Sequence, residues 1–408
     1  MADARRDHRL VFVDLWASWC PPCMAMRASA FDDPKVIALA DRFVWVAIDD
    51  DGAEGGELSK RWGLESLPVV LVLDPEAPPS SALRARWSTT SLAGAEVAAL
   101  LEAVAPSPLP EGTVDVFSAT VVLRAQDDAG RAARARADAL LEHLPASSPL
   151  APFLVEELVW EAKGRKDFER CAKLAEGWSD RLPAGGLAVN VAFNGHECAK
   201  HTSPPRLESA RHQLDLVQTT LQDPHAPILP FTRGYASYTL RALRLEEKDP
   251  SRADEVTERW LAIAQEQSSR GSLAQRASLS APLEFWLDRF NDYARGATSL
   301  CDIARASPGD GDALRRAAEA LGVAGRVDEG IAAIEHGAAA VPVERRLPVL
   351  WQETELLRKK KDAATEASAL DAALLLPPAA YASRSSAALR AKMKERREEL
   401  RKAARDAK

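Results

Sequence analysis

The sequence predicts an α/β domain over residues 1–105, followed by an all-α region over residues 111–408. One observation is an apolar run, Leu10–Val13, that leads into a Cys-x-x-Cys pair at the start of a helix-forming segment. Another is the change of composition after residues 106–110, which contain three prolines; beyond them alanine, leucine, arginine and glutamate dominate. Because a proline-rich segment acts as a stiff spacer, we place a linker and the domain boundary there.

The elements of the first domain follow from their local patterns. Short apolar runs bounded by turn residues predict buried strands. An aspartate followed by a proline, as at Asp33 and Pro34, predicts the first turn of a helix. In chain order we expect a strand at 10–16, a helix at 20–30, a short helix at 34–41, a strand at 43–48, a helix at 57–62, a strand at 68–73, its hairpin partner at 83–87 and a closing helix at 92–104.

The region after the linker is expected to be a stack of helical hairpins. Residues 154–183 and 313–342 share a helix–turn–helix pattern with a glycine at the turn and a proline at the end, and residues 343–376 fit a further pair. Because a single hairpin cannot bury its apolar face, such hairpins stack into an α-solenoid. Residues 317–338 resemble a degenerate tetratricopeptide repeat that lacks its large aromatic positions.

Cys20 and Cys23 have the spacing of a thiol–disulfide redox pair. The thiolate is the nucleophile of disulfide exchange, and a helix N-terminus lowers a thiol pKa from its ordinary value of about 8.5. Cys20, at the helix start, is therefore expected to attack, and Cys23, one turn further along, to resolve the mixed disulfide. Pro21 and Pro22 fit between them because the N–H groups of a first helical turn have no helical partners.

Two segments resemble the thioredoxin superfamily: residues 13–23, with the sequence VDLWASWCPPC, and residues 63–68, with the sequence GLESLP. Residues 31–36 resemble in particular the thioredoxin-like domains of the DsbD type. The resemblance covers roughly residues 1–105 and implies a central mixed sheet flanked by helices, with thiol–disulfide oxidoreductase activity. A thioredoxin fold has a further strand and helix at its start; here Ala2–Arg6 matches only the tail of that helix, so the fold is expected to be incomplete at its N-terminus.

The resemblance also implies roles for residues around the cysteines. Asp14 corresponds to an acid beneath the resolving cysteine that moves its proton, and Pro68 to a cis-proline that shapes the substrate groove. Two positions depart from the common pattern: Val69 replaces a frequent threonine, and Trp45 stands where thioredoxin has a buried lysine. The expected substrate-binding residues are Trp19, Pro21, Pro22, Leu67, Pro68 and Val69.

The other cysteines do not predict a metal site. A zinc site at the redox pair would need two more ligands. The nearest cluster, around His196 and Cys198, is unsuitable because these side chains diverge by about 200° at helical spacing. Cys171, Cys198 and Cys301 are interpreted as unpaired, with Cys171 and Cys301 as packed core thiols. We expect neither a metal nor another cofactor.

The composition limits which classes of partner and which cellular compartment we expect. The net charge of −7 gives no reason to propose nucleic acid, and no apolar run is long enough to predict a membrane span. Unpaired cysteines, with nothing before Leu10 that resembles a signal peptide, favour the cytoplasm. The alternative, if a signal segment is missing upstream, is the bacterial periplasm or cell envelope.

The sequence therefore predicts a thiol–disulfide oxidoreductase whose helical region binds partners. Those partners would be proteins that carry disulfides or dithiols, with an upstream electron donor such as a thioredoxin reductase-like protein or a membrane thiol carrier. The alternative is a helical adaptor in which the thioredoxin-like domain serves regulation or docking. The residues leave the direction of electron flow open, because redox potentials differ widely within this fold.

Overall fold

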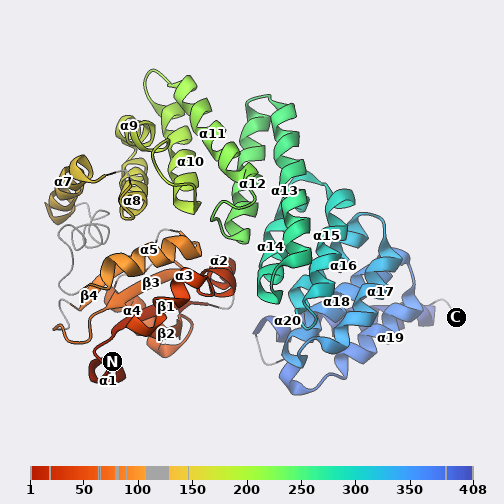
Figure 1. Cartoon of the computed structure of the whole chain (residues 1–408). Coiled ribbons are helices and arrows are strands. Elements are labelled where there is room, and N and C mark those ends of the chain that lie inside the picture. The colour runs from red at the N-terminus through yellow and green to blue at the C-terminus, as the bar shows by residue number, and fades with distance from the viewer. Residues whose placement is uncertain are drawn as a thin grey trace. The chain divides into compact units, whose positions relative to one another are not determined.

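The computed structural model describes residues 2–17, 20–62, 64, 66–78, 82–88, 90–106, 128–145, 147–381 and 384–406 (Figure 1). It divides into two compact units, residues 1–257 and 258–408, with the boundary inside one long helix, α13 (Pro250–Arg270). Of the linker expected at 106–110, only Pro106 lies within the described residues. The domain boundary at that linker stays a prediction.

The first unit begins with a mixed four-stranded sheet, as predicted. Its strands are β1 (Leu10–Trp16), β2 (Phe43–Asp49), β3 (Val69–Leu73) and β4 (Leu83–Trp87), in the order β2-β1-β3-β4. β1 runs parallel to β2 and antiparallel to β3, and β3 pairs with β4 as the expected hairpin. The central place of β1 explains its apolar sequence, because residues 11–15 are all buried.

Short helices surround this sheet. They are α1 (Ala2–Arg6), α2 (Pro21–Ala25), α3 (Pro34–Ile37), α4 (Ala53–Trp62) and α5 (Gly94–Val104). The active-site helix continues from α2 into a π-helical turn, Met26–Ala30. The Asp33 carboxylate caps α3 by accepting from the backbone N–H of Lys35 at 2.8 Å. α3 is shorter than the predicted 34–41 because the chain changes to a 3₁₀ turn at Ala40–Arg42.

Helices complete the first unit. They are α7 (Asp128–His143), α8 (Ala151–Gly164), α9 (Phe168–Trp178), α10 (Gly186–His201), α11 (Leu207–Gln222), α12 (Pro230–Glu246) and the start of α13. α8 and α9 form the helical hairpin expected at 154–183, and α9, α10 and α11 pack in succession. In Figure 1, α5 lies between the sheet and these helices.

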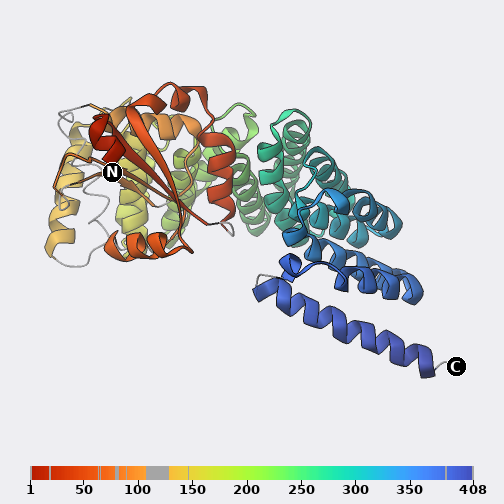
Figure 2. The ribbon, with the colours of Figure 1, turned by 90° about the horizontal axis from the view of Figure 1, so that it is seen from below.

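The second unit is also built from helical hairpins, as Figure 2 shows. Its helices after α13 are α14 (Leu273–Phe290), α15 (Tyr293–Ala306), α16 (Gly311–Val323), α17 (Val327–Gly337), α18 (Val343–Lys360), α19 (Ala363–Leu374) and α20 (Arg384–Asp406). The hairpins predicted at 313–342 and 343–376 are confirmed as α16–α17 and α18–α19. Among the described residues, none after Trp87 lies in a strand. The tetratricopeptide resemblance itself stays a prediction.

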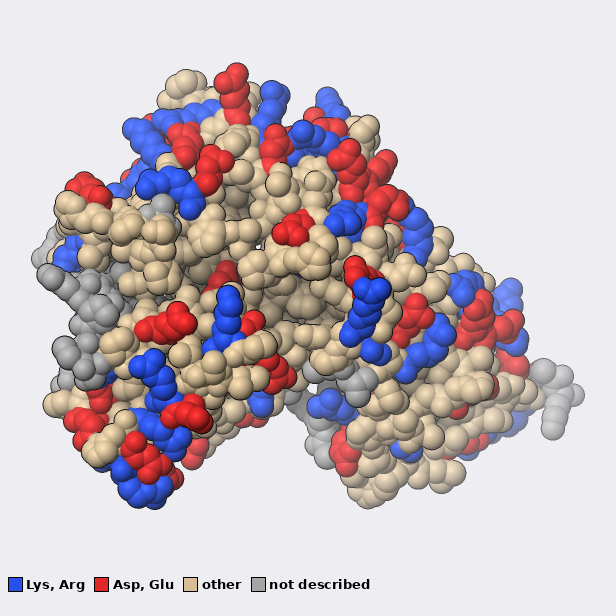
Figure 3. Space-filling model, viewed as in Figure 1, with Lys and Arg blue, Asp and Glu red and all other residues tan. Residues whose placement is uncertain are grey.

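The face that Figure 3 shows is mixed in charge on both units. Figure 3 shows basic and acidic side chains interspersed on the visible face, without a large patch of one sign. Within the described part of the chain, no helix is both long and apolar enough to cross a membrane.

The sheet domain and the helices of the first unit share one hydrophobic core. Trp87 of β4 meets Phe153 of α8 edge to face, with ring centroids 5.0 Å apart. The same buried cluster contains Leu101 of α5 and Leu154 of α8. Residues 1–105 therefore bury apolar side chains directly against the helices that follow.

Glu96 of α5 adds a polar tie to this apolar contact. Its carboxylate accepts from the backbone N–H of Ala93 at 2.8 Å and of Leu187, in the first turn of α10, at 2.9 Å. Gly185 allows this approach, because a Cβ there would lie 2.9 Å from the Glu96 carboxylate. Burial raises the pKa of Glu96 to about 7, although these N–H groups and that of Gly186 lower it.

One expectation about the cysteines is wrong: Cys171 and Cys198 are not unpaired but form a disulfide between α9 and α10. A Cβ on Gly195 would overlap the Cβ of Ala175, so these two helices pack unusually closely. The Cα atoms of Cys171 and Cys198 are consequently 5.9 Å apart, within the range that a disulfide requires. Cys301 is the free cysteine among the described residues.

This disulfide is expected to stabilise the first unit. It closes a separation of 27 residues, for which the chain-entropy relation gives about 3–4 kcal/mol. Replacing both Cys171 and Cys198 by alanine should therefore lower the free energy of unfolding of the first unit by about that amount. Urea unfolding under non-reducing conditions measures the change. Cys301→Ala is the matched control, and a double variant as stable as this control would contradict the prediction.

Candidate functional site

The predicted redox pair lies at the start of α2 as a disulfide between Cys20 and Cys23. Cys20 is the N-cap residue of α2, with Pro21 and Pro22 in the first turn, as the sequence indicated. The Cys20 sulfur accepts from the backbone N–H of Cys23 at 3.2 Å. After reduction the same N–H points at the sulfur where negative charge would develop, which favours Cys20 as the thiolate.

Both cysteines are covered in this oxidised state. Cys20 is 3% exposed and Cys23 is fully buried. They form a small apolar cluster with Ala17, against which Trp16 and Leu67 pack. A partner disulfide must therefore reach the Cys20 sulfur through a confined opening.

Asp14 lies on β1 beneath the active-site helix. Its side chain is buried, and the Nε of Arg27 approaches one carboxylate oxygen at 3.8 Å. Arg27 lies four residues after Cys23, one helical turn further on, so the two side chains share a face of the helix. Through Arg27 the Asp14 carboxyl lies next to the active-site helix, whereas its place beneath the resolving cysteine stays a prediction.

The Asp14 carboxyl has the electrostatic properties of a proton acceptor. Burial raises its pKa to about 6, although the charge of Arg27 lowers it. Its other oxygen, Oδ1, is buried without a hydrogen-bond partner among the described residues. A carboxyl with a pKa just below neutrality can both take and return a proton near pH 7, as general acid–base chemistry requires.

Arg27 was not predicted from the sequence. Its guanidinium lies over the Trp16 ring, 4.0 Å from the centroid, as well as near Asp14. The one sequence feature that could have indicated its role is the position of this arginine, four residues after the second cysteine.

Trp45, which stands where thioredoxin has a buried lysine, packs against Phe12 with ring centroids 4.2 Å apart. The cation near Asp14 thus comes from the helix and not from β2.

The loop before β3 contributes the cis-proline that the resemblance implies. The Leu67–Pro68 peptide bond is cis, and both residues line a cavity together with Pro22. Val69 follows as the first residue of β3 and is fully buried. Trp19 lies outside the described residues. The structure thus gathers Pro22, Leu67 and Pro68 beside the disulfide, whereas their part in substrate binding stays a prediction.

The other candidate site, the cluster around His196 and Cys198, does not have the side chains free for metal binding. Within the described part of the chain, no group of three or more His, Cys, Asp or Glu residues could hold a metal ion. Cys198 is bonded to Cys171, and Nδ1 of His196 contacts the backbone oxygen of Ala210 at 2.9 Å.

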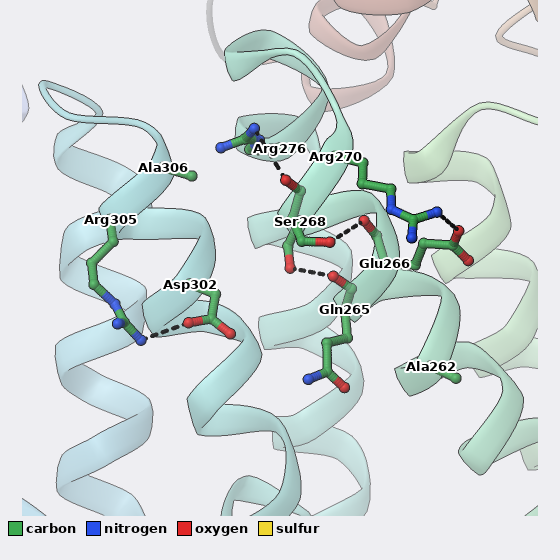
Figure 4. Close-up of a pocket in the computed structure, with 10 residues that line it drawn as sticks. Ala262, Gln265, Glu266, Ser268, Arg270, Arg276, Asp302, Arg305 and Ala306 are labelled. Carbon is green, nitrogen blue, oxygen red and sulfur yellow. Dashed lines mark hydrogen bonds and ion pairs between the residues drawn. The ribbon is translucent and has the colours of Figure 1, made fainter.

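A larger cavity of about 900 Å³ lies in the second unit, between α13 and α15. Figure 4 shows that its charged side chains pair with one another: Arg270 with Glu266, and Arg305 with Asp302. The charges that line it are therefore engaged within the protein, and the redox pair remains the better candidate.

Comparison with known proteins supports the assignment of the first domain. The thioredoxin-like family model matches residues 1–75. The thiol:disulfide interchange protein DsbD of Pseudoalteromonas atlantica is 30% identical over 76 residues, and that of Pseudomonas fluorescens 33% over 75; each match covers 18% of this chain and 13% of the relative. Thioredoxin H4 of Arabidopsis thaliana is 35% identical over 72 residues, or 17% of this chain and 56% of the relative.

These matches share one part of the chain. This protein carries a thioredoxin-like domain at its N-terminus, homologous to DsbD and to thioredoxins. The match spans little more than half of thioredoxin H4 and about an eighth of the DsbD proteins. The helical remainder of the chain lies outside the matched residues.

Because the pKa of Asp14 is raised, replacing its carboxyl by a neutral amide should stabilise the folded protein in a pH-dependent way. Well below pH 4 the carboxyl is protonated in both the folded and the unfolded state. Between about pH 4 and pH 6 the unfolded state ionises while the folded state stays protonated, so the folded state loses stability as pH rises, and above about pH 6 the full loss is present. The shift from 3.8 to about 6 corresponds to roughly 3 kcal/mol at most. Asp14→Asn should therefore be more stable than wild type at pH 8 and about equal to it at about pH 3.

Thermal unfolding of the oxidised protein at the two pH values measures this difference. Asp41→Asn, at an exposed carboxyl of the same domain, is the control and should change the midpoint little. An Asp14→Asn variant that is less stable than wild type at pH 8 would be inconsistent with a carboxyl held in an unfavourable environment.

Proposed function

We propose that this protein is a thiol–disulfide oxidoreductase that acts on protein disulfides through Cys20 and Cys23. The observation that carries the proposal is the disulfide at the N-terminus of α2, with a buried Asp14 carboxyl next to Arg27 of the active-site helix and with Leu67, which precedes cis-Pro68, packed against the cysteines. The homology to DsbD and thioredoxins supports redox chemistry of this class. The protein partners and an upstream thiol donor are part of the proposal.

The reductive half of the cycle has two steps. The Cys20 thiolate attacks one sulfur of the partner disulfide; a mixed disulfide forms, and the other partner sulfur leaves as a thiolate that takes up a proton. Cys23 then loses its proton to Asp14 and attacks the Cys20 sulfur, which restores the Cys20–Cys23 disulfide and releases the second partner thiol. The partner gains two electrons and two protons, and an upstream dithiol donor must return them. Run backwards, the same steps oxidise a partner dithiol.

The low exposure of Cys20 favours the adaptor role as a second candidate function. Cys20 is only 3% exposed, and α12 packs against α2. A thioredoxin-like domain used for docking would tolerate a covered cysteine, whereas an enzyme must open a path to it. Turnover of a protein disulfide by the full chain separates the two roles.

For the compartment, we propose an oxidising environment such as the bacterial periplasm or cell envelope. The expectation of a cytoplasmic protein rested on unpaired cysteines together with the lack of a recognisable signal peptide, and the pairing of Cys171 with Cys198 removes the first of these grounds. Disulfides away from a redox centre form and persist mainly in oxidising compartments. The homology to the DsbD proteins is compatible with this choice.

The two cysteines should behave differently when mutated. In Cys20→Ser the attacking sulfur is absent, so insulin reduction by the full chain should fall to background. In Cys23→Ser the mixed disulfide cannot be resolved, so covalent complexes should accumulate on non-reducing gels. Complexes that accumulate in Cys20→Ser instead would reverse the roles. Wild-type protein without reductase activity would favour the adaptor role.

The compartment can be tested on protein taken from its native cells. The cells are lysed in denaturant with an alkylating reagent, so that buried thiols also react, and peptides are mapped without reduction. We expect the peptides that contain Cys171 and Cys198 to be joined, with Cys301 alkylated. Alkylation of both Cys171 and Cys198 would place the chain in a reducing compartment.

A further inference from the structure

A groove of about 280 Å³ opens beside the redox pair, with one side from the thioredoxin-like domain and the other from the helices. All of its lining lies within the first unit. The thioredoxin-like side consists of Pro22, Leu67, Pro68, Thr90 and Ser91. The helical side is formed by two helices. α10 contributes Asn190 and Phe193, and α12 contributes Phe231, Thr232, Tyr235, Ala236 and Thr239. Leu67 also packs against the two cysteines, so this groove adjoins the disulfide directly.

Hydrogen bonds hold the helical side of the groove, at α12, against the thioredoxin-like domain and the preceding loop. The Ser91 and Thr232 hydroxyls lie 2.9 Å apart and join the loop after β4 to α12. Arg233, which is almost completely buried, donates to the backbone oxygens of Leu221 at 2.7 Å and Ala226 at 3.1 Å. The first turn of α12 is therefore held from both sides, and the groove is a preformed feature of the first unit.

The chemistry of the lining is aromatic and neutral. Phe231 and Tyr235 stand with ring centroids 5.7 Å apart, and Tyr235 is 45% exposed although it is a large aromatic residue. Among the described residues that line the groove, the polar ones carry hydroxyl or amide side chains, and none is Lys, Arg, Asp or Glu. A volume of 280 Å³ is at the lower end of small-molecule sites, which start at about 300 Å³, and suits one or two side chains.

We infer that this groove binds a large apolar side chain of a partner polypeptide, next to the partner cysteine that reacts with Cys20. The inference rests on the proposed redox function and adds its substrate class: a disulfide in an extended segment that carries a neighbouring aromatic or branched aliphatic residue. The helical region thereby contributes selectivity at the site of the chemistry itself.

The position and charge of the groove favour this occupant over a small charged thiol. Cys20 is 3% exposed, so a chain joined to its sulfur must leave the site along the neighbouring surfaces that Pro22, Leu67 and Pro68 provide. Aromatic walls stabilise apolar side chains by removing their surface from water. A charged thiol such as glutathione would have to desolvate its carboxylates against a lining that offers them no cationic partner.

The inference is tested with short synthetic peptides that contain one disulfide and differ only in the residue beside one cysteine: Phe, Ala or Asp. The readout is the second-order rate constant for reduction of each peptide by the reduced full-length protein. Because burial of a Phe side chain contributes about 1.5–3 kcal/mol, the Phe peptide should react about tenfold or more faster than the Ala peptide. The ratio of the two constants cancels general changes in reactivity.

Two variants alter the groove in opposite ways. Tyr235→Ala removes its exposed wall, and Thr239→Trp fills it; in both, the Phe-to-Ala ratio should fall close to one. Tyr235→Phe keeps the ring and should keep the ratio. Phe285→Ala is the matched control, since it removes an aromatic side chain that is also 45% exposed but lies on α14 in the second unit.

Several results would overturn the inference. They are a wild-type ratio near one, a ratio that survives in both groove variants, or faster reduction of glutathione disulfide than of the Phe peptide. A second readout is fluorescence anisotropy of labelled peptides with serine in place of cysteine, bound to the oxidised protein; the same order of affinities is expected. If wild type fails to reduce hydroxyethyl disulfide, the proposed redox function is lost, and the anisotropy order alone decides whether the groove binds apolar side chains.

Discussion

The buried carboxylate of Glu96 is the contact on which the arrangement of the first unit depends. It binds backbone N–H groups at the start of its own helix, α5, and at the start of α10. α10 has no cap from its own side chains, so the thioredoxin-like domain supplies it. Because α10 and α12 form one wall of the groove beside the cysteines, the cap on α10 helps to position that wall. Under the inference above, Glu96 thereby links the fold to selectivity.

The redox site contains a buried carboxyl, Asp14, that lowers the stability of the fold. A carboxyl under the active-site helix, with one oxygen that has no hydrogen-bond partner among the described residues, destabilises the folded state as pH rises from about 4 to about 6 and fully above that. Arg27 offsets only part of that cost, because its guanidinium is shared between Asp14 and the Trp16 ring. Proteins retain such arrangements where a group must change its protonation state during function. The local instability at Asp14 is therefore consistent with proton transfer to and from Cys23.

The parts of this structure that follow from local sequence could be predicted, and those that depend on packing between distant segments could not. The strands are short apolar runs bounded by turn residues, the α16–α17 hairpin has a glycine at its turn and a proline at its end, and the Cys20–Cys23 motif defines its own helix start. The disulfide between Cys171 and Cys198 was missed because its signal lay in Ala175 and Gly195, whose small size brings two helices together. The groove was missed because its two sides come from segments that are far apart in the sequence, the nearest being Ser91 and Asn190.

The Cys171–Cys198 disulfide has a consequence for a protein that carries a reactive dithiol of its own. Thiol–disulfide exchange requires a thiolate to reach a sulfur atom, and neither Cys171 nor Cys198 has exposed surface. Cys20 keeps 3% of its surface exposed and, through Leu67, adjoins the groove, so under the proposed function the two sulfur pairs differ in their access to partner thiols. The burial of Cys171 and Cys198 would then protect the disulfide that joins α9 and α10 from exchange with the protein's own dithiol, including the dithiol of a second copy.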